Sequence, residues 1–305
     1  MCAREQFSGV NSIKFNNRFQ SDDDCYRYIS EIKWSSGVYH CKRCGNSKYG
    51  KGKKPYSRRC AKCNYDESPT AGTMFDKCKF SLLIAFHIAF KISTKKKGMS
   101  SEELSKEFEQ RQKTCWEFKW KVQQAMQSSG LYPLKGEVQV DEFYVGGAEE
   151  GGKRGRGAEN KRLVVVALEI VEGEYGRAYA TVIKDASSAS FKPFFEKYIE
   201  NDTEVVTDEW TGYLPLKSKY KKMRQVPSNS GKGLPELHIH IMNIKSWLRG
   251  IHHHCSEERL QGYLDEYHFR FNRRNKMESI FDVLIRRMVD CKPIRLKNKR
   301  KRTAT

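Results

Sequence analysis

The sequence has 305 residues, with 57 Lys plus Arg against 37 Asp plus Glu and a formal net charge of +20. This length allows about two domains of roughly 100–200 residues each, and such a basic excess indicates a polyanionic partner, most often nucleic acid. No apolar run reaches the roughly 18 residues of a membrane span, so no membrane partner is expected. Ten cysteines without a signal-peptide pattern argue against a secreted disulfide framework and for a cytosolic protein whose Cys pairs hold metal.

Residues 1–35 are predicted to form a helical lead-in. Ser21 and the three acids after it are a typical helix start, and Ile29 and Ile32 supply apolar positions.

Residues 36–75 carry the metal-binding pattern of a zinc ribbon. Cys41-Lys-Arg-Cys44 and Cys60-Ala-Lys-Cys63 are separated by fifteen residues, giving C-x2-C-x15-C-x2-C. Four thiolates complete a tetrahedral, closed Zn²⁺ site, so this zinc is expected to fold the ribbon rather than to catalyse. The basic residues around the four cysteines favour contact with DNA.

Residues 76–130 are predicted to be a helical DNA-binding region. Apolar residues recur at helical spacing near Leu82–Phe90, a possible Ser cap precedes Glu103, and a third helix covers about 112–128. Three short helices in this order resemble a helix-turn-helix, whose last helix lies in a major groove. The alternative is a helical bundle that only packs.

Residues 131–290 are predicted to form the catalytic domain. Strands are expected at 137–145, 162–171 and 177–183, a helix at about 187–200, and a fourth strand at 204–207. The fold class is therefore α/β, and the order βββαβ with acids at the ends of the first and fourth strands is the plan of an RNase H-like fold, a mixed sheet with flanking helices. In that fold these two strands are neighbours, which would bring Asp141 and Asp208 together.

Two acids on a rigid sheet suit metal-assisted phosphodiester chemistry, which uses two divalent ions about 4 Å apart. Mg²⁺ prefers oxygen ligands such as carboxylates. Glu142 and Glu209 follow the two Asp residues, so on a strand they should point to the opposite face and are not expected as ligands. A third ligand is expected from the helix that starts near Pro235, but the segment His238–Gly250 contains no acid.

Four segments together resemble the insertion-sequence transposases of the DDE superfamily, of the type that joins a zinc ribbon, a helical DNA-binding region and an ISXO-like catalytic domain. The segments are Val138–Gly147, Thr207–Tyr213, Asn243–His254 and Leu260–Arg274. The resemblance implies cutting and joining of double-stranded DNA at element ends and target, with Mg²⁺ or Mn²⁺. It also implies a homo-oligomer on DNA, associated with the nucleoid in the bacterial cytosol.

The resemblance implies that Asp141 and Asp208 are catalytic metal ligands. For the third position we prefer His238, because Lys245 follows it by seven residues on the same helical face; Asn243, with Arg249 nearby, is the alternative. Lys245 would hold a DNA phosphate or base. A catalytically inactive, transposase-derived DNA-binding protein and a ribonuclease or resolvase on the same fold are the other functions considered. Residues 291–305 are predicted to be a basic tail.

Overall fold

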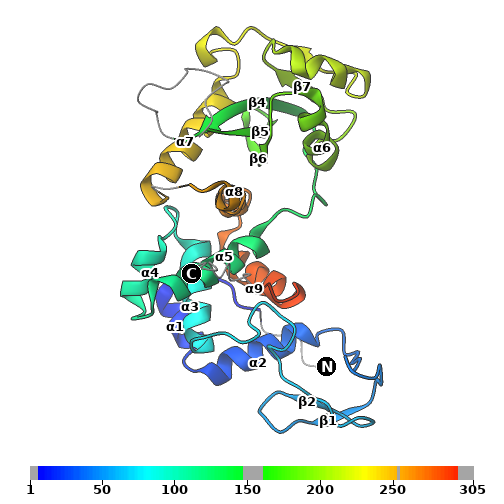
Figure 1. Ribbon diagram of the computed structural model, residues 1–305, viewed down its shortest axis with the longest axis vertical. Coiled ribbons are helices and arrows are strands. Elements are labelled where there is room, and N and C mark those ends of the chain that lie inside the picture. Colours follow the sequence, from blue (N-terminus) through cyan, green and yellow to red (C-terminus); the bar gives the residue numbers. More distant parts are fainter. Residues whose placement is uncertain (1–5, 147–160, 253–254, 295–305) are drawn as a thin grey trace, which may run out of the picture. The chain divides into compact units, whose positions relative to one another are not determined.

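The computed structural model describes residues 6–146, 161–252 and 255–294, which divide into two compact units (Figure 1). Unit 1 contains the described residues up to Ala125 and from Lys276 onward, and unit 2 those from Met126 to Asn275. Most of the expected basic tail lies outside the described residues. Among the described helices, none combines the length and apolar character needed to cross a membrane.

Unit 1 is mainly helical, and its helices begin where side chains can cap them. Ser21 and Asp24 form a capping box at the start of one helix, and Ser100 and Glu103 form another, so each pair satisfies backbone N–H groups that the helix leaves unpaired. The helices are α1 (Ser12–Arg18), α2 (Asp22–Lys33), α3 (Leu82–Thr94), α4 (Ser101–Glu107), α5 (Gln112–Met126) and α9 (Ile280–Asp290), with a 3-10 turn at Met277–Ser279.

Aromatic rings form the core between α1, α2, α3 and α9. Phe15 stacks on Phe90 with ring centroids 4.2 Å apart, and Phe281 of α9 packs edge-on against Phe15 at 5.3 Å. The buried hydroxyl of Tyr28 donates to Asp282. The catalytic domain was expected to run to residue 290. Helix α9 packs in unit 1 instead, because its apolar face completes this aromatic core.

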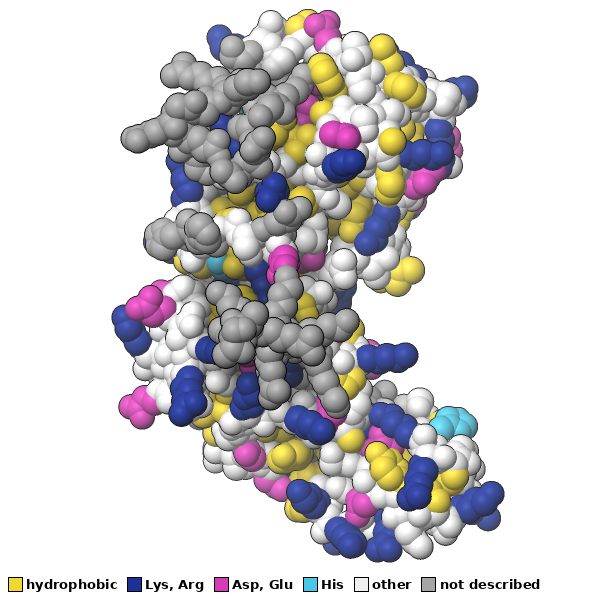
Figure 2. Space-filling view, in the orientation of Figure 1, with side chains coloured by type: hydrophobic (Ala, Val, Ile, Leu, Met, Phe, Trp, Pro, Cys, Tyr) yellow, Lys and Arg dark blue, Asp and Glu magenta, His cyan; other side chains and the backbone are white. Residues whose placement is uncertain are grey.

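The cysteine pairs lie at a three-stranded antiparallel sheet made of β1 (Tyr49–Lys51), β2 (Arg58–Cys60) and β3 (Asp66–Glu67). Cys60 is the last residue of β2, and the other three cysteines lie outside the strands. The Arg58 guanidinium lies over the rings of Trp34 and Tyr49, 4.5 and 4.1 Å from their centroids, a cation–π arrangement that ties the sheet to the end of α2. Figure 2 shows other Lys and Arg side chains over this ribbon.

Unit 2 is a five-stranded mixed sheet with helices on both faces. Its strand order is β6-β5-β4-β7-β8, with β4 antiparallel to β5, β5 antiparallel to β6, and β7 parallel to both β4 and β8. The strands are β4 (Glu137–Val145), β5 (Arg162–Val171), β6 (Glu174–Ile183), β7 (Glu204–Thr207) and β8 (Arg224–Gln225).

The expected strands are confirmed, with one change at the second turn. The third strand begins at Glu174 rather than 177, because the hairpin uses only Glu172 and Gly173, both at positive φ. Such a two-residue turn matches the twist of an antiparallel pair. β4 and β7, the first and fourth strands of unit 2 in chain order, are neighbours in the sheet as expected.

The two faces of the sheet are covered by different helices, seen on either side of it in Figure 1. One face packs against α6 (Ser188–Tyr198) and the 3-10 helix η1 (Thr211–Ser218) through residues such as Val138 and Val140. The other face packs against α7 (Pro235–Ile251) and α8 (Glu257–Phe271) through residues such as Phe143 and Val166. Alternation along β4 thus sends successive side chains to different layers.

Side chains from α8 and from Asn272, the residue after α8, form hydrogen bonds with the outer backbone groups of the edge strand β6. Asn272 both donates to and accepts from the backbone of Ala178 at 2.9 Å. Gln261 donates to the Ala180 carbonyl and accepts from the Val182 N–H, at 3.2 and 3.0 Å. Amide side chains therefore take the backbone groups that an adjoining strand would use.

Candidate active site

Asp141 and Asp208 are brought together by the parallel pairing of β4 and β7. Val140 is in register with Thr207, and each acid is the residue that follows one of this pair, with Asp208 directly after the end of β7. Asp141 was expected at the end of its strand, but β4 continues to Val145 along β5. Asp141 instead lies level with the end of the shorter β7, and its carboxylate lies close to that of Asp208.

A third carboxylate joins them. Ligand oxygens of Asp141, Glu142 and Asp208 all lie within 4.8 Å of one another. The strand alternation holds for Glu142, since its Oε2 accepts a hydrogen bond of 2.7 Å from Tyr213 on the α6 face. The expectation that this alternation would keep Glu142 away from the two Asp residues is not met, because its long side chain still ends beside them.

Hydrogen bonds orient the two Asp side chains. Oδ1 of Asp141 accepts from the N–H of Glu142 at 2.7 Å, and Oδ1 of Asp208 accepts from the N–H of Trp210 at 3.1 Å. The Gln225 amide donates to the Asp208 carbonyl at 2.9 Å. Fixed carboxylates of this kind can meet a cation with little rearrangement.

Gln139, which the sequence analysis did not single out, attaches α7 to the sheet. Its buried side chain accepts from the N–H of Leu237 at 3.2 Å and donates to Glu236 at 3.0 Å. It thereby satisfies one of the N–H groups at the start of α7, whose N-cap residue Leu234 makes no side-chain cap. The sequence did contain a sign of this role, since a polar residue between Val138 and Val140 in a buried strand needs hydrogen-bond partners.

This attachment places His238 against Asp141. Nε2 of His238 lies 3.3 Å from Oδ2 of Asp141. Gly231 lies close to the other side of the ring, since a Cβ at that position would approach Nδ1 of His238 to 2.9 Å. The imidazole therefore occupies a narrow space between the sheet and the turn before α7.

Lys245 follows His238 by two helical turns, and its Nζ lies 5.3 Å from the ring centroid of Phe143 on β4. Asn243 is exposed and lies about 140° around the helix from His238, at 100° a residue. Of the two alternatives for the third position, His238 is the one whose side chain is at the carboxylates.

The buried setting changes the acidity of these groups. Burial, followed by repulsion from Glu142 and Asp208, raises the pKa of Asp141 from 3.8 to about 7. Burial and the Lys245 charge lower the pKa of His238, and burial lowers the pKa of Lys245. Repulsion among the carboxylates contributes to the raised pKa of Asp141, and a divalent cation bound between them would relieve it.

The donor set fits such a cation. Three carboxylates offer hard oxygen ligands, as Mg²⁺ and Mn²⁺ prefer. His252, in the expected motif beyond α7, stacks on Tyr263 with ring centroids 3.6 Å apart and does not join the carboxylates. His253 and His254 lie outside the described residues.

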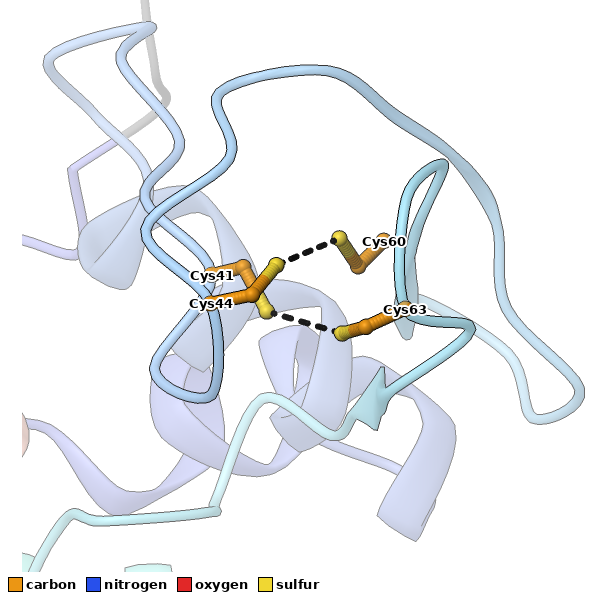
Figure 3. A group of neighbouring side chains, drawn as sticks. All are labelled: Cys41, Cys44, Cys60 and Cys63. Atoms are coloured by element: carbon orange, nitrogen blue, oxygen red, sulfur yellow. Dashed lines mark hydrogen bonds between the residues drawn. The ribbon is translucent and has the colours of Figure 1, made fainter.

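The four cysteines of the ribbon converge on one point (Figure 3). Sγ of Cys41 lies 3.5 Å from Sγ of Cys63, and Sγ of Cys44 lies 3.6 Å from Sγ of Cys60. Four sulfurs each about 2.3 Å from a tetrahedral Zn²⁺ would be about 3.8 Å apart, so the cluster fits this ion. The N–H of Cys63 helps to lower the pKa of Cys60 to about 6, whereas desolvation and the other three sulfurs raise the pKa of Cys44 to about 12. Four thiolates this close together therefore need a cation such as Zn²⁺ among them.

Two comparisons with known proteins agree on the class of the chain. A curated protein of Halobacterium salinarum, described as an uncharacterized protein in transposable element ISH50, is 23% identical over 278 residues, which cover 83% of this chain and 91% of that protein. The profile of the ISXO2-like transposase domain matches residues 133–272, the stretch that holds β4, β7 and α7. The expected resemblance to insertion-sequence transposases is thus confirmed, and it is carried by the ISXO2-like transposase domain at residues 133–272.

Proposed function

We propose that this protein binds the ends of an insertion sequence and performs metal-dependent DNA strand cleavage and strand transfer. The observation that carries the proposal is the meeting of Asp141 and Asp208 on neighbouring parallel strands inside a transposase domain. The order of the strands, with the first and fourth adjacent, supports an RNase H-like fold for unit 2.

Asp141 and Asp208 would hold Mg²⁺ or Mn²⁺. Divalent ions, when bound there, activate the attacking oxygen and stabilise the leaving oxygen of a phosphodiester. His238 supports the site by its contact with Asp141. Lys245 lies on the same helical face and supplies positive charge for a DNA phosphate next to the carboxylates, whereas the exposed Asn243 contributes less.

The ribbon and the helical region would bind the element ends. Structural Zn²⁺ on the four cysteines orders a small sheet with many basic residues, which suits contact with DNA phosphates. Helices α3 to α5 are in the order of a helix-turn-helix and provide a second surface for duplex DNA. Two ends must join in one event, so a homo-oligomer is expected on DNA, at the nucleoid in the cytosol.

The test is metal-dependent nicking of a duplex that carries the element's own ends. The wild-type chain should nick at the ends with Mg²⁺ or Mn²⁺, and Asp141→Ala should abolish nicking while end binding in a gel-shift assay persists. His238→Ala should lower the rate by about 100-fold, a typical cost of losing a supporting side chain. Asn243→Ala is the matched control on the same helix and should stay near the wild-type rate.

The absence of an acid on α7 at His238 favours one competing function, an inactive DNA-binding protein derived from a transposase. Wild-type protein that binds the ends but does not nick them with either metal would support that alternative. Cleavage of an RNA strand, or recombination at paired internal sites, would instead indicate a ribonuclease or a resolvase. Retained nicking by Asp141→Ala would refute the assigned site.

A further inference from the structure

The proposed metal site contains a third carboxylate, Glu142, which the alternation of side chains along β4 did not lead us to expect there. Glu142 follows Asp141 and points to the α6 face, yet its carboxylate lies within 4.8 Å of ligand oxygens of both Asp residues. We propose that Glu142 is the third carboxylate ligand of the metal centre and that Tyr213 positions it. This proposal rests on the proposed function, because it assumes that divalent cations bind at Asp141 and Asp208.

Tyr213 holds Glu142 in a defined place. Its hydroxyl donates to Oε2 of Glu142 at 2.7 Å, and its ring stacks on Phe191 of α6 with centroids 4.4 Å apart and an interplanar angle of 12°. The ring is completely buried, so its hydroxyl has one fixed position. A carboxylate has about four acceptor sites, so accepting this hydrogen bond does not prevent it from binding a cation.

Charge and ligand number agree with this role. Since α7 brings His238 rather than an acid to the site, Asp141 and Asp208 alone would offer two negative charges to two divalent ions. Glu142 adds a third negative charge and another hard oxygen ligand, the type that Mg²⁺ prefers. β4 therefore supplies the acid that α7 lacks at the position of His238.

Glu209 shows that an acid directly after a catalytic Asp does not have to join the carboxylate group. It follows Asp208 as Glu142 follows Asp141, but its side chain is exposed, and the three-carboxylate group contains Glu142 and not Glu209. Glu209 is therefore a matched control, with the same side chain at the corresponding position after the other acid.

The experiment is calorimetric titration of the full-length, zinc-loaded chain with Mn²⁺, with metal-free thermal unfolding as a check of folding. Glu142→Gln should weaken Mn²⁺ binding about tenfold or more, and Tyr213→Phe should weaken it by about tenfold, as loss of a partner of a metal ligand typically does. Tyr213→Phe keeps the ring and its stacking on Phe191, so its effect isolates the hydroxyl. Glu209→Gln should bind like the wild type, and Asp141→Asn should lose binding.

A second variant covers the case in which Glu142→Gln does not fold. Glu142→Asp keeps the charge but shortens the side chain by one methylene, so it should also weaken Mn²⁺ binding. It should change the Mn²⁺ EPR spectrum of the bound ion as well, a readout that a purely structural role would leave unaltered.

The outcomes separate the two proposals. Wild-type affinity in Glu142→Gln or Glu142→Asp, with binding lost in Asp141→Asn, overturns the role of Glu142 and leaves the proposed function in place. Wild-type affinity in Tyr213→Phe overturns the positioning role of the tyrosine. Undiminished binding in Asp141→Asn overturns both the proposed metal site and this inference.

Discussion

Asp141 should make the metal-free protein less stable as the pH rises, and replacing it with Asn should remove that cost. Its carboxyl is mostly buried, and its pKa is raised from 3.8 to about 7 by burial and by Glu142 and Asp208. The unfolded chain thus releases this proton near pH 4 and the folded chain near pH 7, so folding is opposed increasingly across that window. The full shift corresponds to about 4 kcal/mol.

Asp141→Asn keeps the size and shape of the side chain but does not titrate. Without added Mg²⁺ or Mn²⁺, the variant should exceed the wild type in the free energy of unfolding of unit 2 by about 2 kcal/mol at pH 5 and about 4 kcal/mol at pH 8. For a unit of this size, the difference at pH 8 is roughly 10 °C in Tm.

Scanning calorimetry of the zinc-loaded chain measures this effect, and the transition of unit 2 is the one that added Mn²⁺ raises in the wild type. Glu209→Gln, at an exposed acid, is the control and should stay within about 0.5 kcal/mol of the wild type at both values of pH. The reasoning is refuted if Asp141→Asn is no more stable than the wild type at pH 8, or if its advantage does not grow with pH.

Three further changes test other parts of the structure. Gln139→Leu should lower the free energy of unfolding by about 1–3 kcal/mol, because it leaves the start of α7 without its partner, and should also slow nicking. Gly231→Ala and Gly173→Ala both place a side chain at positive φ, at a cost of about 1–2 kcal/mol in the free energy of unfolding. Only the new methyl group at residue 231 contacts His238, so at a temperature where both variants are folded only Gly231→Ala should lower the rate of nicking. Cys60→Ser should lose zinc, measured by mass spectrometry, and end binding, while Mn²⁺ binding by unit 2 persists.

Much of unit 2 could be predicted from local patterns. The β-branched runs and the Gly-containing turns mark β4, β5 and β7, and the adjacency of β4 and β7 brings Asp141 and Asp208 together, as expected from the order of the elements. These features depend on residues that are near one another in sequence, or on a strand order that few folds share.

Other features depend on contacts that sequence patterns do not specify. The amphipathic pattern of α9 predicts a buried face but not the aromatic core that buries it, so its place in unit 1 was missed. Alternation gives the direction of the Cβ of Glu142 but not the place where its carboxylate ends. Gln139 reads as an irregularity in an apolar strand until its partners on α7 are known.

The amide groups along β6 limit how two copies of this protein can pair. Asn272 and Gln261 already take the backbone hydrogen bonds of Ala178, Ala180 and Val182 that a second chain would need in order to extend the sheet. The opposite edge is the two-residue strand β8, which offers little length for pairing. Two copies of the protein are therefore not expected to pair by extending the sheet of unit 2, and the same protection disfavours β-linked aggregates through that sheet.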